Sequence, residues 1–212
     1  MQISAHQKFF FEALSNYVND TQEVGEKLLY FCELISKSNK LYNLTSINSL
    51  EDMIIKHLLD SLSIKNLLMG KKILDIGAGA GFPSIPLACV CKDKHFFLLD
   101  SNNKKIIFLN HAKINLGLEN IYSVHERIEN YNQESNFDTV VCRSYASLSK
   151  IYSNSKKNLR EKGIIIAMKG KYPNAEIDDL KNLNKGLNFT VKKLDVPGLN
   201  LSLIHISEPT RL

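Results

Sequence analysis

The sequence predicts an α/β fold, in which a mainly parallel sheet carries helices on both faces and follows a helical N-terminal extension. Up to about residue 69, apolar residues recur with helical spacing. From residue 70 onward, short apolar runs alternate with amphipathic stretches, and a glycine-rich turn follows the first of these runs. Alternating strands and helices require crossover connections, which favour parallel strands covered on both faces.

Each element is predicted from its own pattern. Helical spacing predicts helices around residues 5–18, 22–37 and 50–68, with Asp20 or Thr21 as the cap of the second. Apolar runs predict strands at residues 72–76, 95–99, 121–124, 138–142, 163–168 and 188–194. We therefore expect an extension over residues 1–69 and a ligand-binding domain over residues 70–200.

The composition is that of a cytoplasmic globular protein. The chain has 212 residues, of which 44% are hydrophobic, and it holds no apolar run long enough to cross a membrane. Residues 1–11 lack the charged start and cleavage site of a signal peptide. The four cysteines show no Cys-x-x-Cys spacing, so we expect neither a zinc site nor disulfides, and no other metal site is predicted. We expect a monomer.

A formal charge of +5 and a pI near 8.9 are only mildly basic. Cations concentrate in one segment, which carries a single acid, Glu161, against Lys156, Lys157, Arg160, Lys162, Lys169 and Lys171. This basic segment either contacts nucleic-acid phosphates or is an ordinary solvated face.

The glycine-rich turn, residues 75–83, reads Asp-Ile-Gly-Ala-Gly-Ala-Gly-Phe-Pro. Gly77, Gly79 and Gly81 carry no Cβ, so a ligand can approach the backbone, and Pro83 suits the first position of a helix. A dinucleotide site would need a third motif glycine where Phe82 stands. The spacing, with Asp75 inside the strand, favours a nucleoside ligand without a pyrophosphate, such as S-adenosylmethionine. The alternative for Asp75 is to brace the turn.

A second acid, Asp100, closes the next predicted strand. A carboxylate at this end of a parallel strand can accept both hydroxyls of a ribose. The alternative is that Asp100 caps the helix that begins near Asn102.

Three further groups follow predicted strands. Ile128 and Glu129 follow the third, where an apolar side chain can lie against adenine. Arg143 follows the fourth and Lys169 the fifth. An arginine beside a ligand crevice suggests recognition of a carboxylate or phosphate, and a structural salt bridge is the alternative.

Several motifs together resemble the ribosomal RNA small subunit methyltransferase G family, also called glucose-inhibited division protein B. They cover about residues 8–200 in order: Asn43-Leu44-Thr45, residues 56–61, 75–86 and 99–101, Lys104-Lys105, Phe108-Leu109, residues 142–146 and Met168-Lys169-Gly170. The resemblance implies a Rossmann-like class I methyltransferase fold. It also implies S-adenosylmethionine-dependent methylation of a guanine N7 in 16S ribosomal RNA, as RNA or within the small ribosomal subunit.

The resemblance places cofactor contacts at Gly77, Phe82, Ile128, Glu129 and Arg143. Our interpretation of the loop and of the ribose position adds Gly79, Asp75 and Asp100. Guanine N7 carries a lone pair and no proton, so its methylation needs no general base. Arg143 and Lys169 are then the candidate catalytic residues, as cations that hold a carboxylate, a phosphate or the guanine O6.

Two departures from the family are visible. Ser38 stands where the family has a tryptophan, and the family's last strand is absent. Residues 201–211 instead resemble a translated sequencing adapter, so we expect residues 201–212 to be non-native, although residues 199–206 are apolar enough for an edge strand.

Other functions stay open from the residues alone. The cofactor loop also fits a methyltransferase that acts on another RNA or a small molecule. Phe82 disfavours a nicotinamide-dependent dehydrogenase, and a non-catalytic RNA-binding module would not need the glycine loop or Asp100. His57 and Asp60, one helical turn apart, either contact RNA or fasten the extension to the sheet.

Overall fold

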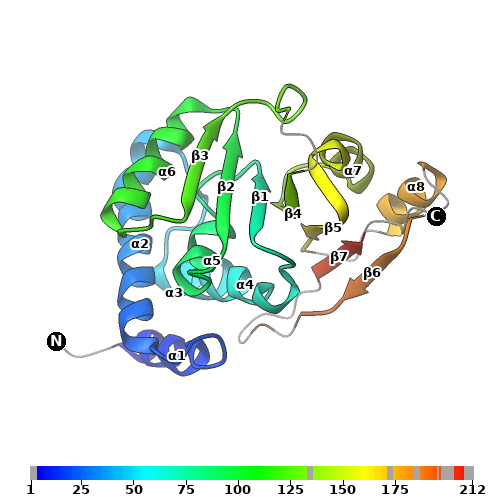
Figure 1. Ribbon diagram of the computed structural model, residues 1–212. Coiled ribbons are helices and arrows are strands. Elements are labelled where there is room, and N and C mark those ends of the chain that lie inside the picture. The colour runs from blue at the N-terminus through cyan, green and yellow to red at the C-terminus, as the bar shows by residue number, and fades with distance from the viewer. Residues whose placement is uncertain are drawn as a thin grey trace.

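A seven-stranded sheet forms the centre of the molecule (Figure 1). The computed structural model describes residues 4–132, 136–170, 174–183, 187–194 and 196, together with the backbone of 203–207. The strands are β1 (Lys72–Ile76), β2 (His95–Asp100), β3 (Ile121–His125), β4 (Phe137–Arg143), β5 (Leu159–Met168), β6 (Phe189–Lys192) and β7 (Leu203–Ser207). They lie in the order β3-β2-β1-β4-β5-β7-β6, and the first five are parallel. All six predicted strands are confirmed.

The position of β7 corrects the expectation of an edge strand. It pairs antiparallel with β5 on one side, from Ile164 opposite Ser207 to Ala167 opposite Ile204, and antiparallel with β6 on the other. β6 therefore forms the edge. The periodicity of apolar residues predicts a strand, but it does not show whether the strand pairs on one side or on both sides. The sequence therefore could not place β7 within the sheet. The origin of residues 201–212 stays a prediction.

The first two predicted helices differ from their expected bounds at the C-terminal end. α1 (Ala5–Leu14) begins with a capping box between Ser4 and Gln7, and it ends four residues early. α2 (Thr21–Tyr42) begins one residue earlier than predicted, and Asp20, one of the two predicted caps, accepts the Glu23 N–H at 3.0 Å. It continues five residues beyond the prediction and ends at Asn43 in the left-handed conformation, with φ at 50°.

The third predicted helix is divided into short segments. They are α3 (Leu50–Met53), the π-helix η1 (Ile54–Leu59), α4 (Asp60–Leu62) and the 3₁₀ turn η2 (Lys65–Leu67). A π-helical turn inside a helix often marks a functional position, because the inserted residue re-aims its neighbours. Here the π-helix carries His57.

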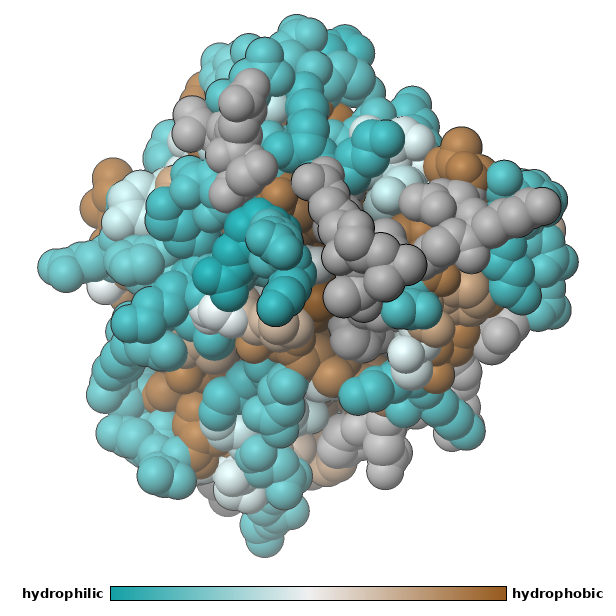
Figure 2. Space-filling model, turned by 45° about the vertical axis from the view of Figure 1, so that its right-hand side comes forward, coloured by the Kyte–Doolittle hydropathy of each residue, from teal (hydrophilic) through white to brown (hydrophobic). Residues whose placement is uncertain are grey.

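Helices cover both faces of the sheet. α5 (Ser84–Val90) and α6 (Asn103–Asn115) pack on one face together with the N-terminal helices, and Phe31, Phe82 and Phe108 join them in one core. α7 (Leu148–Ser155), the turn η3 (Lys156–Asn158) and α8 (Asn174–Leu183) follow β4 and β5, and α7 and α8 supply the core of the other face. Hydrophilic residues cover most of the face in Figure 2, with apolar patches between them. α5 begins at Ser84, so Pro83 is the cap residue, one position earlier than predicted.

The topology changes direction at β1. β2, the next strand in sequence, lies on one side of β1, and β4 lies on the other. Ligands in open α/β sheets bind at the carboxyl ends of the strands beside such a switch point, since the loops there diverge. The loop that leaves β1 at this point is the glycine-rich turn.

Candidate functional site

The glycine-rich turn has the backbone that its sequence predicts. Gly77, Gly79 and Gly81 have φ of 71°, 58° and 95°, in the left-handed region that glycine adopts at little cost. The Gly77 amide donates to the Leu99 carbonyl at 2.8 Å, so the turn is tied to β2. A Cβ on Gly77 would lie 2.9 Å from Cδ2 of Tyr145. A side chain at this position would therefore collide with the Tyr145 ring, so the turn needs a glycine here.

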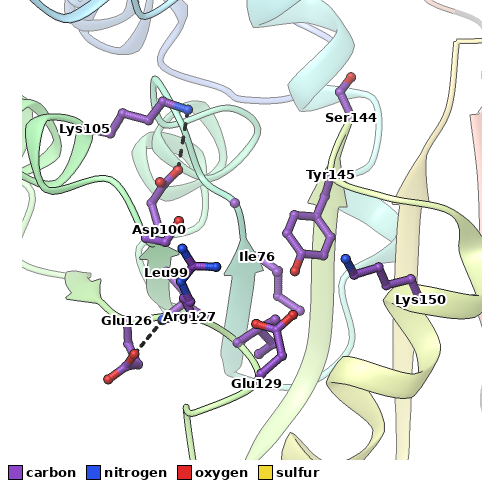
Figure 3. Close-up of a pocket in the computed structure, with 13 residues that line it drawn as sticks. Ile76, Leu99, Asp100, Lys105, Glu126, Arg127, Glu129, Ser144, Tyr145 and Lys150 are labelled. Carbon is purple, nitrogen blue, oxygen red and sulfur yellow. Dashed lines mark hydrogen bonds and ion pairs between the residues drawn. The ribbon is translucent and has the colours of Figure 1, made fainter.

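A pocket of about 350 Å³ opens at the carboxyl ends of the first four strands. We call it the first pocket (Figure 3). Its lining residues come from the ends of these strands, the loops after them and the helices α6 and α7: Ile76, Gly77, Leu99, Asp100, Ser101, Lys105, Glu126, Arg127, Ile128, Glu129, Ser144, Tyr145 and Lys150. Of the nine predicted site residues, the first pocket brings together Gly77, Asp100, Ile128 and Glu129.

Asp100 joins the glycine turn to the start of α6. Its Oδ2 accepts the Gly79 N–H at 2.9 Å, and its Oδ1 accepts the Asn102 N–H at 2.9 Å. Asn102, rather than Asp100, is the N-cap of α6. Lys105 lies 3.8 Å from the carboxylate, as Figure 3 shows. Asp100 thus braces the turn while it lines the first pocket.

Asp75 lies beneath the turn and lines neither this pocket nor the second one described below. It is 1% exposed, and neither carboxylate oxygen has a hydrogen-bond partner in the described part of the chain. Burial raises the pKa of Asp75 to about 7. The facing Ser84 hydroxyl and amide moderate this rise without reaching hydrogen-bonding geometry. An uncompensated buried carboxylate favours a positive charge nearby.

Ile128 and Glu129 form the wall that follows β3. Ile128 is buried, and the Glu129 carboxylate accepts the Asn154 Nδ2–H at 3.1 Å. Tyr145 and Lys150, which sequence reasoning did not select as site residues, face Glu129 in Figure 3. Tyr145 follows Arg143 by two positions, in the loop at the carboxyl end of β4. This position could have identified Tyr145 as a site residue from the sequence.

A second pocket, of about 240 Å³, adjoins the first and shares Gly77, Lys105 and Ser144 with it. Its other lining residues are Leu44, Thr45, His57, Ala78, Gly79, Ala80, Phe82 and Arg143. Phe82 and Gly79 therefore line this second pocket and not the first. The Phe82 ring stacks on the His57 ring, with centroids 4.4 Å apart.

Arg143 is engaged by the extension. Its Nη1 donates to Asp60 Oδ2 at 3.1 Å and to the Lys56 carbonyl at 3.2 Å, and its Nη2 lies 2.6 Å from His57 Nδ1. The guanidinium also lies 5.4 Å from the Phe82 centroid. Arg143 therefore forms the structural salt bridge that was the alternative to ligand recognition. Through this salt bridge, His57 and Asp60 fasten the extension to the sheet. Burial raises the pKa of Asp60, and Arg143 opposes that rise.

Lys169 lies outside both pockets. Its Nζ donates to the Ala146 carbonyl at 2.6 Å and lies 2.9 Å from Glu176 Oε2. The same Glu176 carboxylate accepts the Leu148 N–H at 2.8 Å. Lys169 therefore ties β5 and α8 to the start of α7, and this geometry does not support the predicted catalytic role.

The basic segment is not one surface. Arg160 pairs with Asp138 at the amino ends of β5 and β4, opposite the pockets, while Lys169 lies at the carboxyl end of β5. Lys157 donates to the Glu129 carbonyl at 2.8 Å. This placement favours the solvated-face alternative; Lys171 lies outside the described residues.

The described residues contain no group of three histidine, cysteine, aspartate or glutamate side chains that could hold a metal ion. None of the helices described here is long and apolar enough to cross a membrane. The thiols of Cys32, Cys89 and Cys142 are free and buried, and burial raises the pKa of each to about 12.

Comparison with known proteins identifies the family of this chain. The family model of rRNA small subunit methyltransferase G matches residues 24–204. The ribosomal RNA small subunit methyltransferase G of Methylococcus capsulatus is 43% identical over 183 residues, which cover 86% of this chain and 87% of the relative. That of Legionella pneumophila strain Corby is 41% identical over 176 residues, covering 83% and 82%.

Solved structures show the same fold. An S-adenosylmethionine-dependent methyltransferase from Aquifex aeolicus superposes with a TM-score of 0.60 at 15% identity, covering 83% of this chain and 98% of that one. The predicted Rossmann-like class I methyltransferase fold is confirmed. The match of the family model over most of the chain, together with relatives above 40% identity, shows that the chain belongs to the ribosomal RNA small subunit methyltransferase G family.

Proposed function

We propose that this chain transfers a methyl group from S-adenosylmethionine to N7 of a guanine in the 16S RNA of the small ribosomal subunit. The observation that carries the proposal is the pair of adjoining pockets, which share Gly77, Lys105 and Ser144. One pocket has the residues that hold a nucleoside cofactor, and the other gives a methyl acceptor access to the same loop. The proposed RNA substrate is taken from the names of the relatives, which are ribosomal RNA small subunit methyltransferases.

The first pocket fits the cofactor. Gly77 lines the pocket without a Cβ, so a ligand can approach its backbone, and the Asp100 carboxylate lines the pocket as an acceptor for ribose hydroxyls. Ile128 offers an apolar surface for adenine, next to Glu129. The Asp75 carboxyl beneath the turn has no hydrogen-bond partner among the described residues, and in its ionised form it favours the positively charged end of the ligand. S-adenosylmethionine supplies a methyl group that its sulfonium already activates.

The second pocket suits an acceptor that needs no general base. Its histidine, His57, has both ring nitrogens engaged, by Arg143 and by Thr45. Burial and the nearby Arg143 lower the pKa of His57 to about 4, so the ring is a poor base at neutral pH. Guanine N7 has a lone pair and no proton to lose. Catalysis then consists of aligning N7 with the methyl carbon and sulfur and of excluding water.

Arg143 acts in this proposal from the wall of the second pocket, as a residue that positions His57 and the extension. Lys169 acts further away, by holding α8 against the loop that carries Tyr145. An RNA substrate also implies that the chain works in the cytoplasm, where small subunits are assembled, and we expect it to act as a monomer.

The experiment is to map 7-methylguanosine in small-subunit RNA from cells with the intact gene, without it, and with a Gly77→Val copy. We expect one modified guanine that disappears in the second and third strains. Calorimetry on the purified protein should show binding of S-adenosylmethionine and none of NAD. Cofactor binding with unchanged small-subunit RNA would contradict the proposed substrate and leave another RNA or a small molecule.

A further inference from the structure

Thr45 lies in the loop that joins α2 to α3, and this loop is held firmly. Asn39, one turn before the end of α2, accepts the Leu44 and Thr45 amides with its Oδ1, at 2.7 and 3.0 Å. Its Nδ2 donates to the Thr45 carbonyl at 2.8 Å. Because the backbone on both sides of Thr45 is bonded to one side chain, the Thr45 hydroxyl has a defined position in the wall of the second pocket.

The tautomer of His57 follows from its partner Arg143. A guanidinium only donates hydrogen bonds, so Nδ1 of His57, 2.6 Å from Arg143 Nη2, is the acceptor and carries no proton. The Lys56 carbonyl, 3.2 Å from the same nitrogen, receives the Arg143 Nη1–H instead. The lowered pKa of His57 agrees with a neutral ring. The single ring proton is therefore on Nε2.

Thr45 Oγ1 consequently accepts two hydrogen bonds from other residues of the protein. The His57 Nε2–H donates to it at 2.9 Å, and the Ile47 N–H donates to it at 3.1 Å. A hydroxyl has two acceptor positions and one hydrogen. With both acceptor positions used, the hydroxyl can offer a ligand only its hydrogen, and no described residue accepts that hydrogen. The Arg143–His57–Thr45 chain thus fixes Thr45 as a donor toward the second pocket.

We propose that Thr45 determines base specificity by donating a hydrogen bond to O6 of the guanine whose N7 is methylated. The inference rests on the proposed function. Guanine presents two neighbouring acceptors, N7 and O6, whereas adenine presents N7 beside the N6 amino donor. Methyl transfer to N7 alone does not distinguish the two purines. A hydrogen-bond donor beside position 6 of the purine can bind O6 of guanine. It faces another donor, the N6 amino group, when the base is adenine. His57 and Arg143 are positioning residues, since they act through Thr45.

The test compares two bases at the mapped methylation position, in small-subunit RNA assembled from a synthetic segment and reconstituted into subunits. One is guanine and the other is 2,6-diaminopurine, which keeps N7 and the 2-amino group, carries an amino group in place of O6 and lacks the hydrogen on N1. We expect the wild-type protein to prefer guanine in kcat/KM by about 100-fold or more. Equal use of the two bases would overturn the inference without any variant.

Thr45→Val removes the donor at nearly constant volume. We expect its kcat/KM on guanine to fall about 10- to 100-fold and its preference over 2,6-diaminopurine to fall with it, at unchanged cofactor affinity. Thr45→Ser should restore both. The control is Ser46→Ala, which removes the exposed neighbouring hydroxyl and should change neither. Thermal unfolding checks each variant, and Thr45→Ala replaces Thr45→Val if the latter is unfolded.

The outcomes separate the two proposals. A loss of rate with an unchanged preference in Thr45→Val would make Thr45 merely structural and overturn this inference alone. If the wild-type protein forms no 7-methylguanosine in small-subunit RNA, the proposed function fails, and this inference fails with it.

Discussion

The Asp100 carboxylate accepts the Gly79 N–H at 2.9 Å and so joins the end of β2 to the glycine turn after β1. The same carboxylate lines the first pocket. A single acid therefore shapes the loop and offers its remaining lone pairs to a ligand. A substitution at Asp100 should affect the cofactor site in both ways.

Asp100→Ala is expected to weaken S-adenosylmethionine binding by about 1–3 kcal/mol, because bound hydroxyls lose a charged acceptor and the Gly79 and Asn102 amides lose theirs. Isothermal titration calorimetry measures the change. Asp179→Ala, which removes an exposed acid on α8, is the control. If Asp100→Ala binds S-adenosylmethionine as tightly as the parent protein, the ribose does not bind at Asp100.

Gly77→Ala tests the space above the turn, with Gly117→Ala as a matched control. Both glycines have positive φ, 71° and 61°, so each substitution should cost about 1–2 kcal/mol of stability from backbone strain. A Cβ at Gly77 meets Tyr145 at 2.9 Å, whereas a Cβ at Gly117 meets nothing within 4 Å. We expect only Gly77→Ala to lose cofactor affinity. Equal affinities at equal stability would refute the assignment of the first pocket.

Arg143 and Asp60 are expected to be coupled in stability. Their side chains are 19% and 14% exposed, so removing either leaves a poorly solvated charge behind. A double-mutant cycle with Arg143→Ala and Asp60→Ala, followed by urea unfolding, should give a coupling of about 1–3 kcal/mol. Additive effects would show that the pair does not fasten the extension. Arg143→Ala should therefore lose stability as well as methyl transfer, in contrast to a residue that only binds ligand.

Asp75→Asn should stabilise the ligand-free protein and weaken cofactor binding. The folded pKa of about 7 lies above the ordinary value of 3.8, so the folded state binds the proton more tightly. The ionised carboxylate therefore destabilises the fold increasingly as the pH rises from about 4 to 7, and the effect then levels off. We expect a gain on the order of 2–4 kcal/mol above pH 7 that vanishes near pH 4.

Thermal unfolding across this pH range measures the effect. Asp93→Asn, which makes the same substitution at an exposed position, is the control. A flat difference for Asp75→Asn would show that its carboxyl is not held in an unfavourable site.

Much of the fold follows from local patterns in the chain. Apolar runs and helical spacing report which residues are buried, and six of the seven strands of the sheet, together with the start of α2 to within one residue, appear from them. The order of the strands does not, since pairing joins residues far apart in sequence. β7 lies between β5 and β6 for this reason. The π-helix around His57 is equally hidden, because the apolar spacing of residues 50–68 fits an uninterrupted helix.

The cofactor site shows the same division. The turn at Gly77 and the acid at Asp100 are local features whose chemistry depends on backbone conformation and on position at a strand end, so residue types and spacing suffice to find them. The role of Arg143 depends on which group comes within reach of its guanidinium. Only the packing of the extension against the sheet brings Asp60 and His57, more than eighty residues away, to that distance. Tertiary structure thereby decides that Arg143 is held in an ion pair, and that Thr45 faces the second pocket as a donor.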